Sequence, residues 1–208
     1  MAKRITSLDA REQTPPPLQL LPSGVLRART LVSTGLSRQR IKQLTDSGVL
    51  VHLGRGLYSL PNSQVTENHD LAEIAARVPQ GIVCLSSALQ FHGLTTESPW
   101  RIHLLLPRGA RPPRITYPPI AVTYANDAAY SAGIERHVIE GVEVNVTSVA
   151  KTIADCFKHR NKIGLSVALT ALKQAIYERR TTRAEIRKYA QICRVEKVME
   201  PYMEALAI

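Results

Sequence analysis

Residues 34–60, TGLSRQRIKQLTDSGVLVHLGRGLYSL, constrain the fold of this chain more than any other segment. Gly35 permits a tight turn, because glycine adopts a positive φ without a steric penalty. Ser37 is a favoured N-cap residue, which predicts a helix that begins at the next position. Two short apolar runs enclose Gly54-Arg55-Gly56 and predict a β-hairpin with an arginine at its tip. We therefore expect the second half of a helix-turn-helix followed by a wing.

The predicted helix, from about Arg38 to Asp46, has two chemically different faces. Ile41 and Leu44 lie three residues apart and point toward a core, whereas polar residues occupy the opposite face and its side. Charged helix faces are often merely solvated, but a basic hairpin after the helix favours binding to a DNA groove and its flanking phosphates. The predicted DNA-binding residues are Ser37, Arg38, Gln39, Arg40, Lys42, Gln43, His52 and Arg55.

Charge is unevenly distributed along the 208 residues, whose net charge is +10. Residues 1–62 contain nine Lys or Arg against three Asp or Glu, residues 63–148 six against eight, and residues 149–208 twelve against six. Two basic ends predict two surfaces that attract polyanions. For the basic C-terminal region we favour a solvated surface, and RNA is a further candidate partner for it.

Breaks in the sequence divide the chain into three predicted parts. Residues 1–22, which contain Pro15-Pro16-Pro17, are expected to be a flexible arm. Residues 23–62 are expected to form the winged helix-turn-helix, whose first helix lies within 20–33 and is opened by Ser23-Gly24. Residues 64–208 are expected to form a second domain.

Periodicity in the second domain predicts both strands and helices. A helix is expected over 66–78 with Thr66 as its cap, and strands are expected over 102–106 and 121–125. A hairpin is expected over 137–146, with Glu140-Gly141 at its turn. Four closing helices are expected to begin near residues 148, 165, 181 and 196, with a turn at 161–164 between the first two. The predicted fold class is α+β: an N-terminal winged helix-turn-helix, then a mixed α/β domain that ends in a helical subdomain.

Residues suited to metal binding or catalysis are scattered. Cys84, Cys156 and Cys193 lie far apart, which argues against a zinc site or a disulfide framework. The histidines lack ligand spacing, and phosphate-binding glycine motifs are absent. We therefore expect no metal, no cofactor and no enzymatic activity. The sequence has no apolar signal core and no apolar run long enough to span a membrane, so a cytoplasmic location without a membrane partner is expected.

Several segments together resemble one family. GRGLYSLP, HDLAEIAARVP, GIVCLSSALQFHGLTTE, LPRGARPP and VTSVAKTIADCFKHRNKIGLSVALTALKQAI occur in the order seen in AbiEi antitoxins, which belong to bacterial type IV toxin–antitoxin systems linked to abortive phage infection. The resemblance covers about residues 24–208. It implies an N-terminal winged helix-turn-helix that represses its own operon. It also implies a C-terminal domain that counters a nucleotidyltransferase toxin without a stable complex.

The same resemblance marks a signature in the C-terminal domain, with a structural or antitoxic role rather than a catalytic one. Its residues are Thr147, Ser148, Lys151, Thr152 and Asp155.

We interpret the chain as a DNA-binding antitoxin and autorepressor with double-stranded operator DNA as its partner. Two alternatives stay open. The chain could be a stand-alone winged-helix transcriptional regulator, or a nuclease that its winged helix delivers to DNA, with Asp155 beside Lys151 as part of the nuclease site. An adjacent toxin gene would favour the antitoxin, and metal-dependent DNA cleavage would favour the nuclease.

Overall fold

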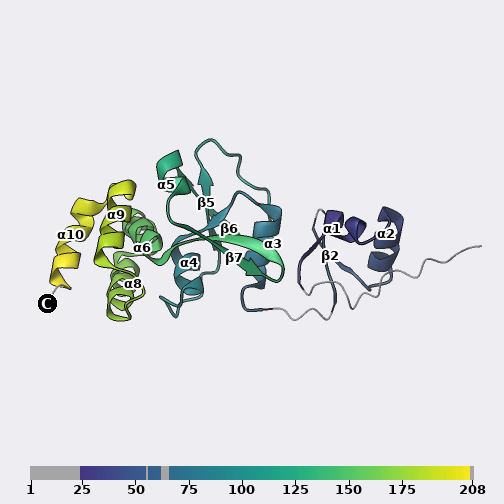
Figure 1. Ribbon diagram of the computed structural model, residues 1–208, viewed down its shortest axis with the longest axis horizontal. Helices are drawn as coiled ribbons and strands as arrows, with labels where there is room; N and C mark the ends of the chain where they lie inside the picture. The colour runs from purple at the N-terminus through teal and green to yellow at the C-terminus, as the bar shows by residue number, and fades with distance from the viewer. Residues whose placement is uncertain (1–23, 55, 62–65, 207–208) are drawn as a thin grey trace, which may run out of the picture. The chain divides into compact units, whose positions relative to one another are not determined.

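The computed structural model describes residues 24–54, 56–61 and 66–206. The chain divides into two compact units, residues 1–63 and 64–208 (Figure 1). Both units contain helices and strands, so the predicted α+β class is confirmed. The predicted arm, residues 1–22, and the predicted wing-tip residue Arg55 lie outside the described residues.

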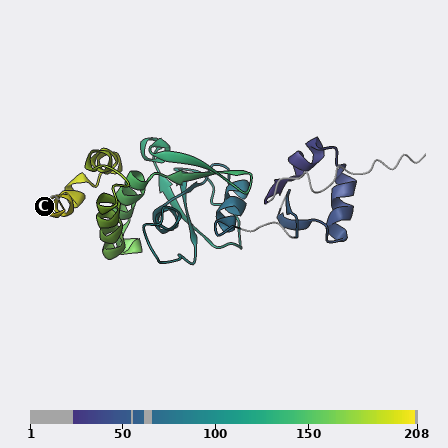
Figure 2. The same ribbon diagram turned by 60° about the horizontal axis from the view of Figure 1, so that its bottom comes forward.

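Unit 1 packs two helices against a small sheet. Its elements are β1 (Leu26–Arg27), α1 (Ala28–Ser33), α2 (Arg38–Asp46), β2 (Val51–Gly54) and β3 (Leu57–Ser59) (Figure 2). The strands form an antiparallel sheet in the order β1-β3-β2. The helices and the sheet share one core, whose buried residues are Leu26, Leu31, Leu36, Ile41, Leu44 and Leu50.

Helix α2 has the bounds that the sequence predicts, but the helix before it does not. Leu26 and Arg27 pair with Tyr58 and Leu57 of β3, so the prediction of a helix opened by Ser23-Gly24 is wrong at these two positions. The helix begins only at Ala28, because the pairing with β3 holds the two preceding residues in an extended conformation. Cross-strand pairing has overridden local helix preference there.

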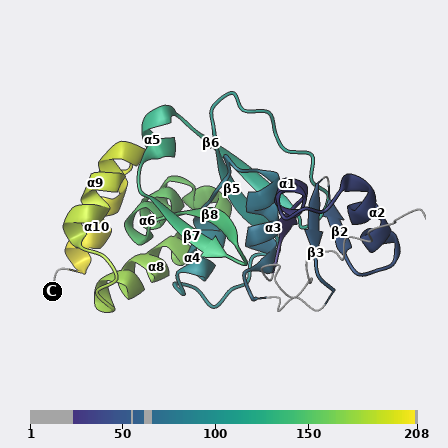
Figure 3. The same cartoon turned by 45° about the vertical axis from the view of Figure 1, so that its right-hand side comes forward.

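Unit 2 is built on a five-stranded mixed sheet with the order β6-β5-β4-β8-β7 (Figure 3). Strands β5 with β6 and β4 with β8 pair in parallel, and the other neighbours pair antiparallel. Up to the last strand, the elements are α3 (His69–Arg77), β4 (Ile82–Val83), α4 (Leu85–Phe91), β5 (Ile102–Pro107), β6 (Ile120–Ala125), α5 (Asp127–Ser131), β7 (Ile134–Ile139) and β8 (Val142–Thr147).

Helices close the chain, as the sequence predicts. They are α6 (Val149–Lys158), α7 (Arg160–Ile163), α8 (Leu165–Tyr177), α9 (Arg183–Cys193) and α10 (Glu196–Ala205). Helix α6 lies inside this group in contact with α4, α8 and α9, and Phe157 is fully buried on it. The turn predicted at 161–164 is instead the short helix α7, because Ile163 N and Gly164 N donate to carbonyls four residues earlier.

The start of α3 also differs from the prediction. The helix begins at His69 rather than Thr66, and Thr66 does not cap it. The backbone N and the Oγ1 of Thr66 donate instead to Glu140 Oε1, at 2.8 and 2.9 Å. Glu140 lies in the β7–β8 turn that the sequence predicts, so this carboxylate fixes the start of unit 2 to its hairpin. Within the described residues, no helix is long and apolar enough to cross a membrane.

Candidate nucleic-acid interface and buried signature network

The candidate interface in unit 1 is the solvent-facing side of α2. Ile41 and Leu44 are 3% and 7% exposed and anchor the helix to its core. The remaining polar positions face solvent, which leaves donors and acceptors for a ligand. The exposed side chains of α2 are Arg38, Gln39, Arg40, Lys42, Gln43 and Asp46, whereas Thr45 is partly buried and donates to Ile41 O at 2.9 Å.

Short local hydrogen bonds order this face. Ser37 Oγ accepts from Arg40 N at 3.1 Å, so the predicted N-cap is confirmed and the hydroxyl holds the first turn. Arg40 Nη1 donates to Gln43 Oε1 at 3.2 Å. The pair orients the Gln43 amide, while Gln39 and Lys42 project from the same exposed side.

Two further basic or aromatic groups flank α2 in sequence. His52 on β2 is exposed, and its ring lies 5.3 Å from that of Tyr58, its cross-strand partner. Arg29 on α1 is also exposed, but it is not among the DNA-binding residues predicted from the sequence. Its signal was weak, because a single arginine outside the predicted second helix has no distinctive spacing.

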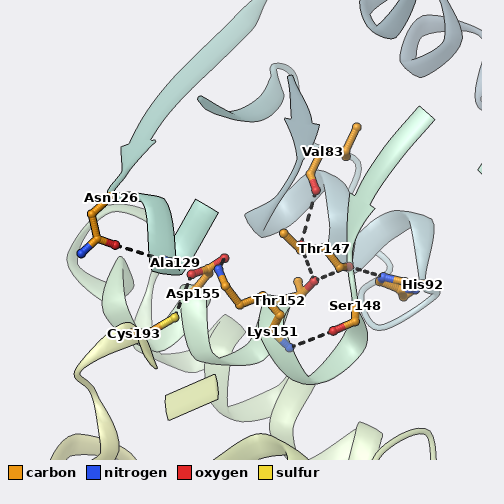
Figure 4. A network of polar contacts seen from close by, with 10 residues as sticks. All are labelled: Val83, His92, Asn126, Ala129, Thr147, Ser148, Lys151, Thr152, Asp155 and Cys193. Atoms are coloured by element: carbon orange, nitrogen blue, oxygen red, sulfur yellow. Dashed lines mark hydrogen bonds and ion pairs between the residues drawn. The ribbon is translucent and has the colours of Figure 1, made fainter. Parts of the chain in front are cut away.

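The five signature residues lie together where β8 leads into α6 (Figure 4). Thr147, Lys151 and Thr152 are fully buried, and Asp155 is 5% exposed. Ser148 is partly exposed and caps α6 by accepting from Lys151 N at 3.4 Å. The cluster is therefore an internal network with one member at the surface.

Two threonines join three elements. Thr152 Oγ1 lies 2.9 Å from Thr147 O and 2.7 Å from Thr147 Oγ1. Thr147 Oγ1 in turn lies 3.4 Å from the carbonyl of Val83 on β4. These contacts tie the first turn of α6 to β8 and to the central strand of the sheet.

The second part of the network centres on Asp155. Lys151 Nζ donates to Asp155 Oδ2 at 2.5 Å, and Cys193 Sγ donates to Asp155 Oδ1 at 3.3 Å. Burial and the Asp155 charge raise the pKa of Cys193 to about 12, so its thiol keeps the proton that it donates. Both carboxylate oxygens thus have partners from the protein, and α9 is joined to α6.

His92 completes the network from α4. Its Nε2 lies 2.7 Å from Thr147 O. Burial lowers the pKa of His92, so the ring is neutral at neutral pH and donates its Nε2 proton to that carbonyl. His92 and Cys193 lie 55 and 38 positions from their partners in sequence, and no local spacing could have revealed either contact.

A surface hollow of 320 Å³ lies beside the N-terminus of α6. Ser148, Arg180 and Tyr189 are among the residues that line it, so Ser148 connects the buried network to the surface. Arg180 Nη2 donates to the His92 carbonyl at 3.1 Å. Among the residues described, no group of three or more His, Cys, Asp or Glu could hold a metal ion.

Comparison with known families identifies the N-terminal part of the chain. Residues 18–97 match a family described as the transcriptional regulator, AbiEi antitoxin N-terminal domain. The resemblance to AbiEi antitoxins, expected over about residues 24–208, is confirmed for the matched residues. The AbiEi match extends beyond unit 1 into unit 2, through helix α4.

Two other comparisons bear on the chain as a whole. No curated protein matches it. Among solved structures, the crystal structure of the RV2827C protein from Mycobacterium tuberculosis is similar, with a TM-score of 0.60 and 15% sequence identity. The similarity covers 88% of this chain and 75% of that one, and at this identity it shows the fold alone.

Proposed function

We propose that the chain is a DNA-binding antitoxin of a bacterial type IV toxin–antitoxin system and acts in the cytoplasm. Unit 1 is a winged helix-turn-helix that binds double-stranded operator DNA and represses its own operon. Residues 64–208 counter a nucleotidyltransferase toxin without a stable complex. The observation that carries this proposal is the exposed polar face of α2 within a match to an AbiEi regulator domain.

The side chains of α2 suit the two tasks of DNA recognition. Arg38, Gln39 and Gln43 are assigned to base edges in the major groove, where arginine suits guanine and glutamine suits adenine. Arg40 and Lys42, with the wing residues His52 and Arg55, are assigned to phosphates, which fix the register of the protein on the duplex.

The buried network supports a structural role for the antitoxin signature. Thr147, Thr152 and Asp155 use their oxygens to hold β8, α6 and α9 together. The outer surfaces of the closing helices then keep a defined shape toward a partner. A nuclease role for Asp155 is disfavoured, because its carboxylate is buried between Lys151 and Cys193.

Binding titrations against the chain's own promoter test the DNA-binding part. Arg38→Ala or Gln39→Ala is expected to reduce the preference for the promoter over a scrambled duplex by about 1–3 kcal/mol at the contacted base. Lys42→Ala is expected to lower the affinity for both duplexes alike. It should also reduce the slope of log affinity against log salt concentration by about 0.9, because one phosphate contact is lost. Lys158→Ala, an exposed lysine on α6, is the matched control. Equal affinity of the unaltered protein for the two duplexes would contradict the proposal.

Co-expression with a nucleotidyltransferase encoded beside the gene tests the antitoxin part. The full chain carrying Arg38→Ala and Gln39→Ala is expected to lose repression but still to rescue growth. Loss of both together would show that rescue depends on DNA binding. That result would favour the stand-alone regulator.

A further inference from the structure

One stretch of unit 2 has a charge opposite to that of its surroundings. Residues 98–126 contain four arginines and no Asp or Glu, although residues 63–148 as a whole are more acidic than basic. All four arginines are exposed, at Arg101, Arg108, Arg111 and Arg114. The stretch therefore presents net positive charge to solvent in an otherwise acidic region.

The same stretch exposes three large aromatic side chains. Trp100 is 73% exposed, Tyr117 is 67% exposed and Tyr124 is 43% exposed. Single exposed apolar residues are common, but three aromatic rings among four unopposed arginines form a more specific combination. Each ring therefore presents part of its surface to solvent, where a planar ligand can reach it.

Sheet topology brings two of these rings to the same end of two neighbouring strands. Trp100 and Arg101 directly precede β5, and Tyr117 lies just before β6. These strands pair in parallel with Ile102 opposite Ile120, and Ile102 N donates to Pro119 O at 2.8 Å. Both rings thus lie where the parallel pair begins.

The backbone beneath these side chains is held by hydrogen bonds. Arg77 Nη1, from the end of α3, donates to Tyr117 O at 2.6 Å. Ser87 Oγ accepts from His103 N at 2.9 Å and lies 3.4 Å from Arg101 O, to which it donates. The exposed rings consequently project from a fixed frame, which reduces the entropy lost when a ligand binds.

Arg101 is stacked on its neighbour. Its guanidinium carbon lies 3.8 Å from the centroid of the Trp100 ring. The flat guanidinium and the indole therefore form adjoining surfaces on which a base can stack.

The other three arginines extend this surface along the strands. Residues 108–119 connect the end of β5 to the start of β6, arching away from the sheet before they return beside α3 (Figures 1 and 3). A six-residue strand spans about 20 Å, so this connection carries its arginines over a comparable length. The charge is spread along a path rather than gathered at one point.

We propose that this aromatic–arginine surface, made of Trp100, Arg101, Arg108, Arg111, Arg114 and Tyr117, binds single-stranded RNA. Unpaired bases stack on the Trp100 and Tyr117 rings and on the Arg101 plane, and the remaining arginines neutralise phosphates. A duplex keeps its bases stacked inside and would leave the aromatic rings unused. The surface contains no residue of unit 1, so the inference does not depend on operator binding.

Fluorescence anisotropy with the full chain tests the stacking part. Its probes are a short labelled single-stranded RNA, single-stranded DNA of the same sequence, and the corresponding DNA duplex. Trp100→Ala and Tyr117→Ala are each expected to weaken RNA binding roughly tenfold or more. Tyr177→Ala, which removes an aromatic ring that is 88% exposed on α8, is the matched control and should leave RNA affinity unchanged. Affinity for the promoter duplex should be unaffected by all three substitutions.

Salt titrations test the electrostatic part. Replacing Arg108, Arg111 and Arg114 together by Gln is expected to reduce the slope of log affinity against log salt concentration for RNA binding by about 2, because each phosphate contact on a single strand contributes about 0.7. A triple Gln replacement of the exposed lysines Lys162, Lys173 and Lys197 removes the same charge elsewhere and should change the slope less.

Three results would overturn the assignment. RNA binding that survives loss of both rings would show that the arginines attract any polyanion. Tighter binding of single-stranded DNA than of RNA would assign the surface to DNA. A parallel loss of promoter affinity in the ring variants would make the surface part of the duplex interface.

Discussion

Helices α2 and α6 share the same local sequence features, but the lysine and aspartate of α2 are exposed to solvent and those of α6 are buried. Each follows a serine N-cap that accepts a hydrogen bond from the third helical amide. Each also carries a lysine and an aspartate four positions apart, Lys42 with Asp46 and Lys151 with Asp155. On α2 both side chains are exposed, whereas on α6 they are 0% and 5% exposed and joined at 2.5 Å.

The difference comes from what surrounds each helix. Helix α2 covers one side of a small core and leaves its other side to solvent, so its polar groups remain available to a ligand. Helix α6 is enclosed by α4, α8 and α9, so its polar groups must find partners within the protein. The same residue types therefore serve recognition in one helix and internal positioning in the other.

The largest expected contrast is the loss of stability when the aspartate of each helix is replaced. Asp155→Ala is expected to lower the free energy of unfolding by about 3–5 kcal/mol, because it leaves the buried Lys151 without its carboxylate. Asp46→Ala on α2 should stay within about 0.5 kcal/mol. Urea unfolding followed by circular dichroism measures both, and replacing the α6 pair together by Met and Leu should recover part of the loss. An equal loss of stability at the two positions would contradict the different roles assigned to the polar groups of α2 and α6.

Two glycines provide the next largest contrast. Gly133 has a φ of +62°, its carbonyl accepts from Ser148 N, and an added Cβ would lie 2.8 Å from Lys151 Cβ and 2.8 Å from the Tyr189 ring. Gly35, before α2, has a φ of +95° and no atom within 4 Å of that position. Gly35→Ala should cost about 1–2 kcal/mol from backbone strain alone.

Gly133→Ala should lower the free energy of unfolding by about 1–3 kcal/mol more than Gly35→Ala does, because overpacking adds to the backbone strain at Gly133. Thermal and urea unfolding of both variants give the comparison. A smaller cost at Gly133 would show that the packing around the network yields easily.

The smallest expected effect concerns pH. Burial lowers the pKa of His92, so the unfolded chain binds a proton on this side chain at a higher pH than the folded protein does. Its contribution to stability is complete above the unfolded pKa, about 6.5, and is lost as the pH falls through and below that value. The contribution of His92 to the free energy of unfolding is at most about 1.4 kcal/mol for each tenfold change in its proton affinity, and partial solvation of the ring makes this contribution smaller.

His92→Gln keeps a donor for Thr147 O but removes the titration, so stability should fall less between about pH 7.5 and pH 5.5. Urea unfolding at several pH values measures this. His52→Gln, on an exposed residue of unit 1, should leave the pH dependence of unit 2 unchanged. An identical pH dependence in the His92 variant and the unaltered protein would remove His92 from the acid sensitivity of the network.

Sequence signals that act over a few residues predicted their elements well. The Ser37 cap and the Ile41–Leu44 spacing gave the bounds of α2, and the Glu140-Gly141 turn located its hairpin. Signals that depend on competition with distant residues failed. Leu26 was assigned to a helix because nothing local reveals its pairing with Tyr58, and Thr66 was assigned as a cap although Glu140 takes its hydroxyl.

By itself, the sequence determined the α+β class and the polar face of α2, because caps, turns and periodicity depend on near neighbours. Only the tertiary structure decided that Lys151 and Asp155 are buried and that His92 and Cys193 join their network. It also decided that Trp100 and Tyr117 lie at the same end of two parallel strands. Burial and long-range pairing arise from packing between segments far apart in the chain, and no local pattern encodes which segments meet.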